Sequence, residues 1–112
     1  MSYKLEKVNE LIKQELGKII FAQEEFGPGV MVTLMAVKTS PDLRDAAVTF
    51  SVLPTQKGKP VLKKLSADAS NLRRLLTKKL RMHPVPIIRF VLDETETESQ
   101  KIDMLIEKIK PH

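Results

Sequence analysis

Residues 59–83, KPVLKKLSADASNLRRLLTKKLRMH, combine the clearest helical pattern in this sequence with its most uneven distribution of charge. The apolar residues recur at i, i+4, i+7, i+11 and i+15, with three more beside them: Leu65, Ala69, Leu72, Leu76 and Leu80, then Val61, Leu62 and Leu75. This spacing predicts a helical segment that buries one face. The fold should therefore be built around this segment.

The same stretch carries eight Lys or Arg residues and a single acid, for a net charge of +7, whereas the whole protein carries +5. A chain that concentrates its positive charge on one element favours a polyanionic partner. A merely solvated helix face, which is the alternative, usually mixes signs to form i,i+4 pairs. The candidate polyanion-binding residues are Lys59, Lys63, Lys64, Asp68, Ser70, Arg73, Arg74, Lys78, Lys79 and Arg81. Of these, Arg74, Lys78 and Arg81 should align on the side turned away from the core.

The helical pattern is expected to break in its middle, at residues 66–71, because SADASN contains several side chains that compete for backbone donors. We predict two helices, at about 61–67 and 69–82, joined by a kink. Asp68 or Ser70 should cap the second helix. Amides exposed at this helix start, together with the positive end of the helix dipole, would suit a phosphate.

Length and composition limit the remaining possibilities. A chain of 112 residues with 42% hydrophobic content fits one domain spanning residues 1–112. Cysteine is absent, which excludes disulfides and thiolate metal sites. Residues 1–18 interleave charged and apolar residues, so they predict neither a signal peptide nor a membrane span, and a cytoplasmic location follows. Only 4% of residues are aromatic, which counts against a platform that stacks single-stranded bases.

The N-terminal segment predicts a helix that Ser2 can cap and that runs to about Phe21. Its expected core face consists of Leu5, Val8, Leu11, Ile12, Leu16, Ile19 and Ile20. The sequence FGPG at 26–29 resembles a phosphate loop only superficially, because no GK[ST] follows it, and we interpret it as a turn.

Three further segments predict strands. Residues 30–39 are rich in β-branched side chains, but both alternating faces are largely apolar, so the inward face stays open. After a turn at 40–45, residues 46–52 alternate cleanly, with Ala46, Val48, Phe50 and Val52 facing inward. The third strand is 87–92. An acidic run then leads into a last helix with the apolar face Ile102, Leu105, Ile106 and Ile109; its acids favour the positive end of the dipole over a metal site.

The order αββααβ(α) predicts an α+β fold with a three-stranded mixed sheet. The first two strands form an antiparallel hairpin, and the crossover through the helix pair brings the third strand parallel to the second, which is central. Helices should cover one face of the sheet. The other face, with Thr49, Ser51 and Arg89, should meet solvent.

Several motifs carry a resemblance to a known family: VKTSPDL at 37–43, AAVTFSVL at 46–53, LRRLL at 72–76, LRM at 80–82, Pro86 and FVLD at 90–93. With these motifs the chain resembles the ribosome-binding factor A family, small bacterial assembly factors with a type II KH-like fold. That family has an interhelical kink of Ala-x-Gly type. The matching positions here are Asp68-Ala69-Ser70, or Ala67-x-Ala69 if the alignment is shifted, and contain no glycine.

The resemblance implies a non-enzymatic ribosome assembly factor in the cytoplasm, active especially in the cold. Its partners would be the small (30S) ribosomal subunit or its precursor and the 16S rRNA, during late maturation and rRNA processing, with further assembly factors nearby. The alternative is a basic protein-interaction module that docks an acidic protein. We expect a monomer with no membrane contact.

A catalytic function finds little support in the sequence. The two histidines are His83, beside a proline at a helix end, and the terminal His112. The residues needed for a nucleophile, a base and oxyanion donors are not assembled in any recognisable motif. We therefore expect neither catalysis nor a cofactor.

Overall fold

A computed structural model of the protein describes residues 2–81 and 84–94. Its elements are α1 (Ser2–Gln23), β1 (Met31–Thr39), β2 (Asp45–Leu53), the short 3-10 helix η1 (Thr55–Lys57), α2 (Gly58–Ala67), α3 (Ala69–Leu80) and β3 (Ile87–Leu92). The predicted order αββααβ is confirmed over this part of the chain. The last helix predicted from the sequence lies outside the described residues, as does the side chain of Ser2.

The strands form one mixed sheet in the order β1-β2-β3. β2 pairs antiparallel with β1 and parallel with β3, so Val48 lies between Val37 and Phe90. This confirms the predicted hairpin, the parallel crossover through α2 and α3, and the central place of the second strand. Each buried residue of β2, at positions 46, 48, 50 and 52, alternates with a residue facing the other side.

A bulge in β1 explains why the sequence shows no single inward face for this strand. Leu34 pairs with Phe50 and Ala36 pairs with Thr49, which leaves Met35 as an extra residue. An extra residue in a strand reverses which alternate side chains face the core. Accordingly, Leu34 packs against the core before the bulge, whereas Val37 is buried after it. Both alternating sets must therefore contain apolar residues.

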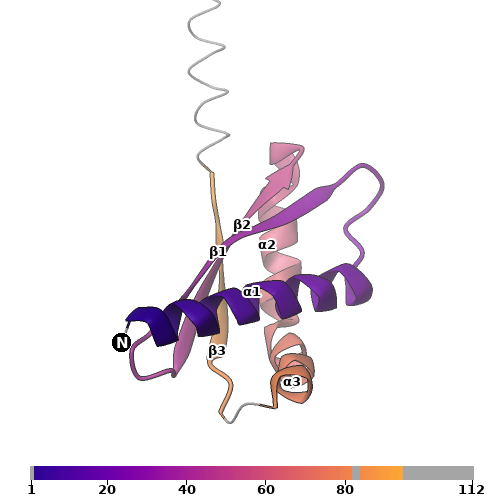
Figure 1. Ribbon diagram of the computed structural model, residues 1–112. Helices are drawn as coiled ribbons and strands as arrows, with labels where there is room; N and C mark the ends of the chain where they lie inside the picture. Colours follow the sequence, from indigo (N-terminus) through magenta and orange to yellow (C-terminus); the bar gives the residue numbers. More distant parts are fainter. Residues whose placement is uncertain (1, 82–83, 95–112) are drawn as a thin grey trace, which may run out of the picture.

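The helices lie on one side of the sheet. In the view of Figure 1, α1 crosses in front, and α2 and α3 follow one another farther from the viewer. The core between the layers includes Ile12, Leu16, Leu65, Leu72, Leu76, Val48 and Phe50. The opposite face carries the exposed Arg89 together with the half-buried Thr49 and Ser51, as predicted. Leu11, which we assigned to the core face of the first helix, is 43% exposed. It lies at the margin of the apolar stripe, beyond the reach of the sheet.

The helix pair breaks where the sequence predicts. α2 ends at Ala67 and α3 begins at Ala69. α2 starts three residues earlier than predicted, at Gly58, which is buried against Leu92: a Cβ atom there would lie 2.9 Å from a Leu92 methyl carbon. α3 ends at Leu80 rather than Met82, because Arg81 adopts a left-handed conformation and its amide donates to the Thr77 carbonyl.

Candidate nucleic-acid interface

The kink does not have the capping arrangement that the sequence suggests. In the described part of the chain the Asp68 side chain makes no capping hydrogen bond to α3, and Ser70 lies inside the first turn of that helix. The Asp68 amide instead donates to the carbonyls of Lys64 and Leu65, and its own carbonyl accepts from the Leu72 amide. Backbone bonding therefore runs through the kink. Asp68 occupies the N-cap position of α3, as predicted, but the prediction that its side chain makes the capping hydrogen bond is wrong.

The kink also lacks the positive φ angle that favours glycine. Among the described residues, the non-glycine positions with positive φ are Leu43 and Arg81. Ser70 has ordinary helical geometry within α3. The absence of the family's glycine therefore creates no strain here, and a glycine at Ser70 would only weaken the helix.

The Asp68 carboxylate faces Glu24, which directly follows α1. Partial burial, a side-chain hydrogen bond to Asp68 and the negative charge of Asp68 raise the pKa of Glu24 to about 7, while the nearby Lys64 ammonium opposes the shift. A carboxyl group with this pKa holds its proton well above the usual pH range for glutamate. Glu24 thus keeps its proton to near-neutral pH and can donate it to the Asp68 carboxylate, close to the kink.

Asp68→Asn is expected to stabilise the protein at about pH 8 and to change little at about pH 5. The folded-state pKa of Glu24 lies above its ordinary value of 4.5, so the folded protein loses stability as pH rises from about 4.5 to about 7. Asparagine removes the repelling charge and keeps a hydrogen-bonding group. Because the pair is only partly buried, the gain should stay below about 1 kcal/mol. Urea denaturation at both pH values measures it, with Glu25→Gln as a control. An equal change at the two pH values would contradict the raised pKa of Glu24.

Two of the eight predicted cations make hydrogen bonds within the fold. The Arg73 guanidinium donates from Nε and Nη2 to the carbonyl of Val85, at 2.9 and 2.6 Å, and so ties α3 to the segment that leads into β3. The Lys64 ammonium donates to the Glu25 carbonyl and lies 5.4 Å from the centre of the Phe26 ring. Such contacts hold helices and loops in place. Neither cation is placed to reach outward as freely as the sequence suggests.

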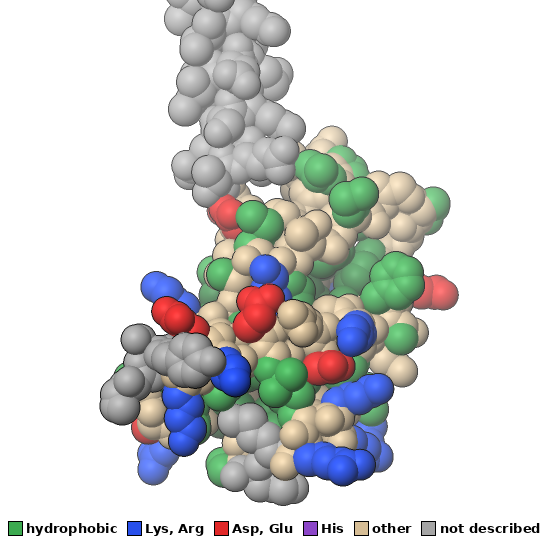
Figure 2. Space-filling model, in the orientation of Figure 1, with side chains coloured by type: hydrophobic (Ala, Val, Ile, Leu, Met, Phe, Trp, Pro, Cys, Tyr) green, Lys and Arg blue, Asp and Glu red, His purple; other side chains and the backbone are tan. Residues whose placement is uncertain are grey.

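The other six predicted cations are exposed, as Lys64 also is, and they separate into two groups. Lys59 and Lys63 lie on α2. The second group, which we call the α3 cluster, consists of Arg74, Lys78, Lys79 and Arg81. Within it, Arg74 donates to the Asn71 side chain at 2.7 Å, on the exposed surface. Figure 2 shows Lys and Arg side chains gathered around the lower part of the molecule, where Figure 1 places α3.

One cation near the α3 cluster was missed by the sequence analysis. Lys18 projects from α1 and, with Lys78 and Lys79, lines a groove between α1 and α3. From the sequence alone, Lys18 is predicted to be an ordinary residue on the polar face of the first helix. Its neighbours come from a segment some 60 residues later, so no local pattern identifies it.

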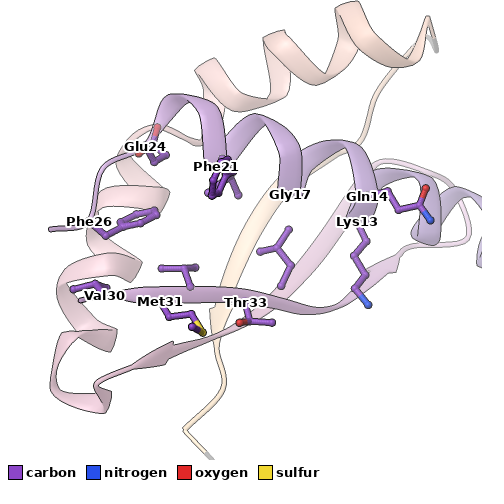
Figure 3. Close-up of a pocket in the computed structure, with 12 residues that line it drawn as sticks. Lys13, Gln14, Gly17, Phe21, Glu24, Phe26, Val30, Met31 and Thr33 are labelled. Carbon is purple, nitrogen blue, oxygen red and sulfur yellow. The ribbon is translucent and has the colours of Figure 1, made fainter. Parts of the chain in front are cut away.

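A second and wider groove lies between α1 and β1, with a volume of about 620 Å³ (Figure 3). It is mostly apolar and is bordered by Phe21, which is 90% exposed, and Met31, which is 62% exposed. Lys13, Gln14 and Glu24 are its charged or amide side chains. They do not bring together a nucleophile, a base and oxyanion donors, so the groove has no evident catalytic arrangement.

Within the described residues, no three His, Asp or Glu side chains are grouped so that they could hold a metal ion. None of the helices described is long and apolar enough to cross a membrane.

The αββααβ order, the three-stranded mixed sheet and the kinked helix pair define a KH-like α+β protein, here with an exposed cationic cluster on the second helix of the pair. The chain belongs to the ribosome-binding factor A family, whose model matches residues 4–106. A ribosome-binding factor A from Coxiella burnetii is 34% identical over 96% of this chain and 91% of its own length. One from Chlorobium phaeobacteroides is 32% identical over 98% and 97%.

Solved structures with the same name share the fold. The crystal structure of the Thermus thermophilus protein is 24% identical, with a TM-score of 0.69 over 79% of this chain and 94% of that one. A homology model of the Thermus protein, fitted into the cryo-EM map of a 30S complex, is 26% identical, with a TM-score of 0.63 over 74% of this chain and 88% of that one.

Proposed function

We propose that this protein is a non-enzymatic ribosome assembly factor. It binds the small (30S) ribosomal subunit or its precursor through 16S rRNA, during late maturation and rRNA processing, with its greatest importance in the cold. It acts in the cytoplasm as a monomer whose residues 1–112 form one domain. The α3 cluster supplies the main contacts to RNA phosphates, and Lys59 and Lys63 on α2 add to them.

One observation carries this proposal: exposed cations concentrate on the helix pair of a chain that belongs to the ribosome-binding factor A family. Outside residues 59–83 the protein is net acidic, so non-specific attraction to RNA over the whole surface is not expected. The 30S complex of the Thermus relative supports the same choice of partner.

Sucrose-gradient sedimentation of the tagged protein, with and without purified small subunits, tests the proposal directly. We expect the protein to move with the subunit at low salt and to stay at the top of the gradient alone. Digestion of RNA in a parallel lysate should release it. Co-sedimentation that survives complete digestion would instead favour the basic module that docks an acidic protein.

Arg74→Glu is expected to weaken binding to the small subunit about ten-fold at low salt, because it replaces one phosphate contact by a repelling charge. The side chain is exposed and points away from the core, so helix content and the melting temperature should change little. Lys4→Glu, the same charge change on an exposed residue of α1, is the matched control. Equal losses in both variants would mean that net charge, and not the α3 cluster, governs binding.

A further inference from the structure

We propose that the groove between α1 and α3 binds one unpaired nucleotide of RNA, with the base against an apolar floor and the adjoining phosphates on a rim of lysines. This inference rests on the proposed function, because it names a site within the RNA-binding surface. It adds a requirement that the α3 cluster alone does not impose, namely an RNA strand that presents an unpaired base.

The groove has a volume of about 460 Å³ and is lined by Lys18, Ile19, Ala22, Gln23, Leu75, Lys78 and Lys79. Ile19 is buried, Leu75 is half-buried, and Ala22, which also lines the groove, has a small and exposed side chain. Volumes of about 300–1,000 Å³ are typical of sites for small molecules, and a nucleoside falls in this class. The Gln23 amide offers a donor and an acceptor to a base edge.

Two helices contribute the positively charged side chains of the rim. Lys18 comes from α1, whereas Lys78 and Lys79 come from the last turn of α3. Lysine stems can cover apolar surface while their ammonium groups reach phosphates. The anion nearest to Lys18 is Glu15, whose carboxylate lies 3.6 Å from the ammonium in an exposed i,i+3 pair. Exposed pairs of this kind are weak, so a phosphate can replace the carboxylate as partner.

The length of the groove favours a nucleotide over a peptide helix. On α1 it runs from Lys18 to Gln23, which is about 7.5 Å along the helix axis. An amphipathic helix bound in a groove places anchors from i to i+7, which needs about 10.5 Å. An acidic helix would therefore overrun this groove. Bases inside a duplex are not available to it, whereas an unpaired base is.

Two RNA hairpins of nearly equal length and charge, each closed by the same base-free linker, test the inference: one has a fully paired stem and the other has a single bulged nucleotide. Fluorescence anisotropy at fixed low salt gives the affinity of the protein for each. Because apolar contact with Ile19 and Leu75 and a hydrogen bond to the base edge add to the phosphate contacts, we expect the bulged hairpin to bind about ten-fold more tightly. Ala22→Leu, which fills the floor without changing charge or helix propensity, should reduce that preference to below about two-fold.

Gln14→Leu is the matched control, because it adds the same side chain at the separate groove between α1 and β1. It should keep the full preference for the bulge. If the wild-type protein binds both hairpins equally, the nucleotide site is wrong and RNA binding by the basic surface still stands. If it binds neither at low salt, the proposed RNA-binding function fails as well.

Two results with Ala22→Leu would also overturn the inference. Retention of the bulge preference would place the unpaired base elsewhere. Weaker binding to the small subunit, with wild-type affinity for both hairpins, would assign the groove to a ribosomal protein.

Discussion

Raising the salt concentration from about 50 to about 200 mM is expected to weaken binding to the small ribosomal subunit by about 60- to 1,000-fold. The range follows if about four to six cations reach phosphates, which gives a slope of about −3 to −5 in log K against log[salt]. Among residues 59–81, all of which the structure describes, Lys64 and Arg73 donate to backbone carbonyls of the fold, although Lys64 is itself exposed. The other six cations, Lys59, Lys63 and the α3 cluster, are exposed as well. The exposed set matches the upper end of that estimate.

Sedimentation or anisotropy measured over a series of KCl concentrations gives the slope. Loss of one phosphate contact should reduce the magnitude of the slope by about 1. Lys79→Gln should therefore give a smaller slope, and Lys4→Gln should leave the slope unchanged. A salt response that is flat in the wild-type protein would remove the basic helices from the binding mechanism.

Replacement of Arg73 by Met is expected to lower the free energy of unfolding by about 1.5–3 kcal/mol. The guanidinium makes two hydrogen bonds to the carbonyl of Val85, a residue that is 2% exposed. Methionine keeps most of the apolar stem but leaves the carbonyl without this donor. Loss of the link should loosen the connection between α3 and β3, which otherwise fixes the end of the helix that carries the α3 cluster.

Arg74→Met makes the same change at the next residue and is the control. Arg74 is exposed and bonds only to a surface asparagine among the interactions described, so its loss should change stability by less than about 0.5 kcal/mol. Urea denaturation separates the two. The expected roles in RNA binding are reversed: Arg74→Met should weaken binding, and folded Arg73→Met should bind nearly as well as the wild type. Equal stabilities of the two variants would show that the Val85 contact contributes little.

The first helix, the alternation of β2 and the break near Asp68 follow from the sequence because each depends on neighbouring residues. The parallel placement of β3 follows as well, since a crossover through helices permits few other arrangements. The concentration of positive charge at residues 59–83 is a property of the sequence itself. Exposure of Arg74 and Lys78 was predictable because helical spacing turns them away from the leucine stripe. Arg81 was assigned to the same helix face, but it lies beyond the end of α3.

Tertiary structure alone decided what several of those residues do. Arg73 and Lys64 look like outward-facing cations until the folded chain brings carbonyls from residues 85 and 25 to them. Asp68 looks like a helix cap until the end of α1 places Glu24 against it. The bulge in β1 and the approach of Lys18 to the α3 cluster also depend on pairing between distant segments. Sequence periodicity indicates which face of a helix or strand is apolar. It does not indicate which polar groups from distant parts of the chain will contact the residues beside that face.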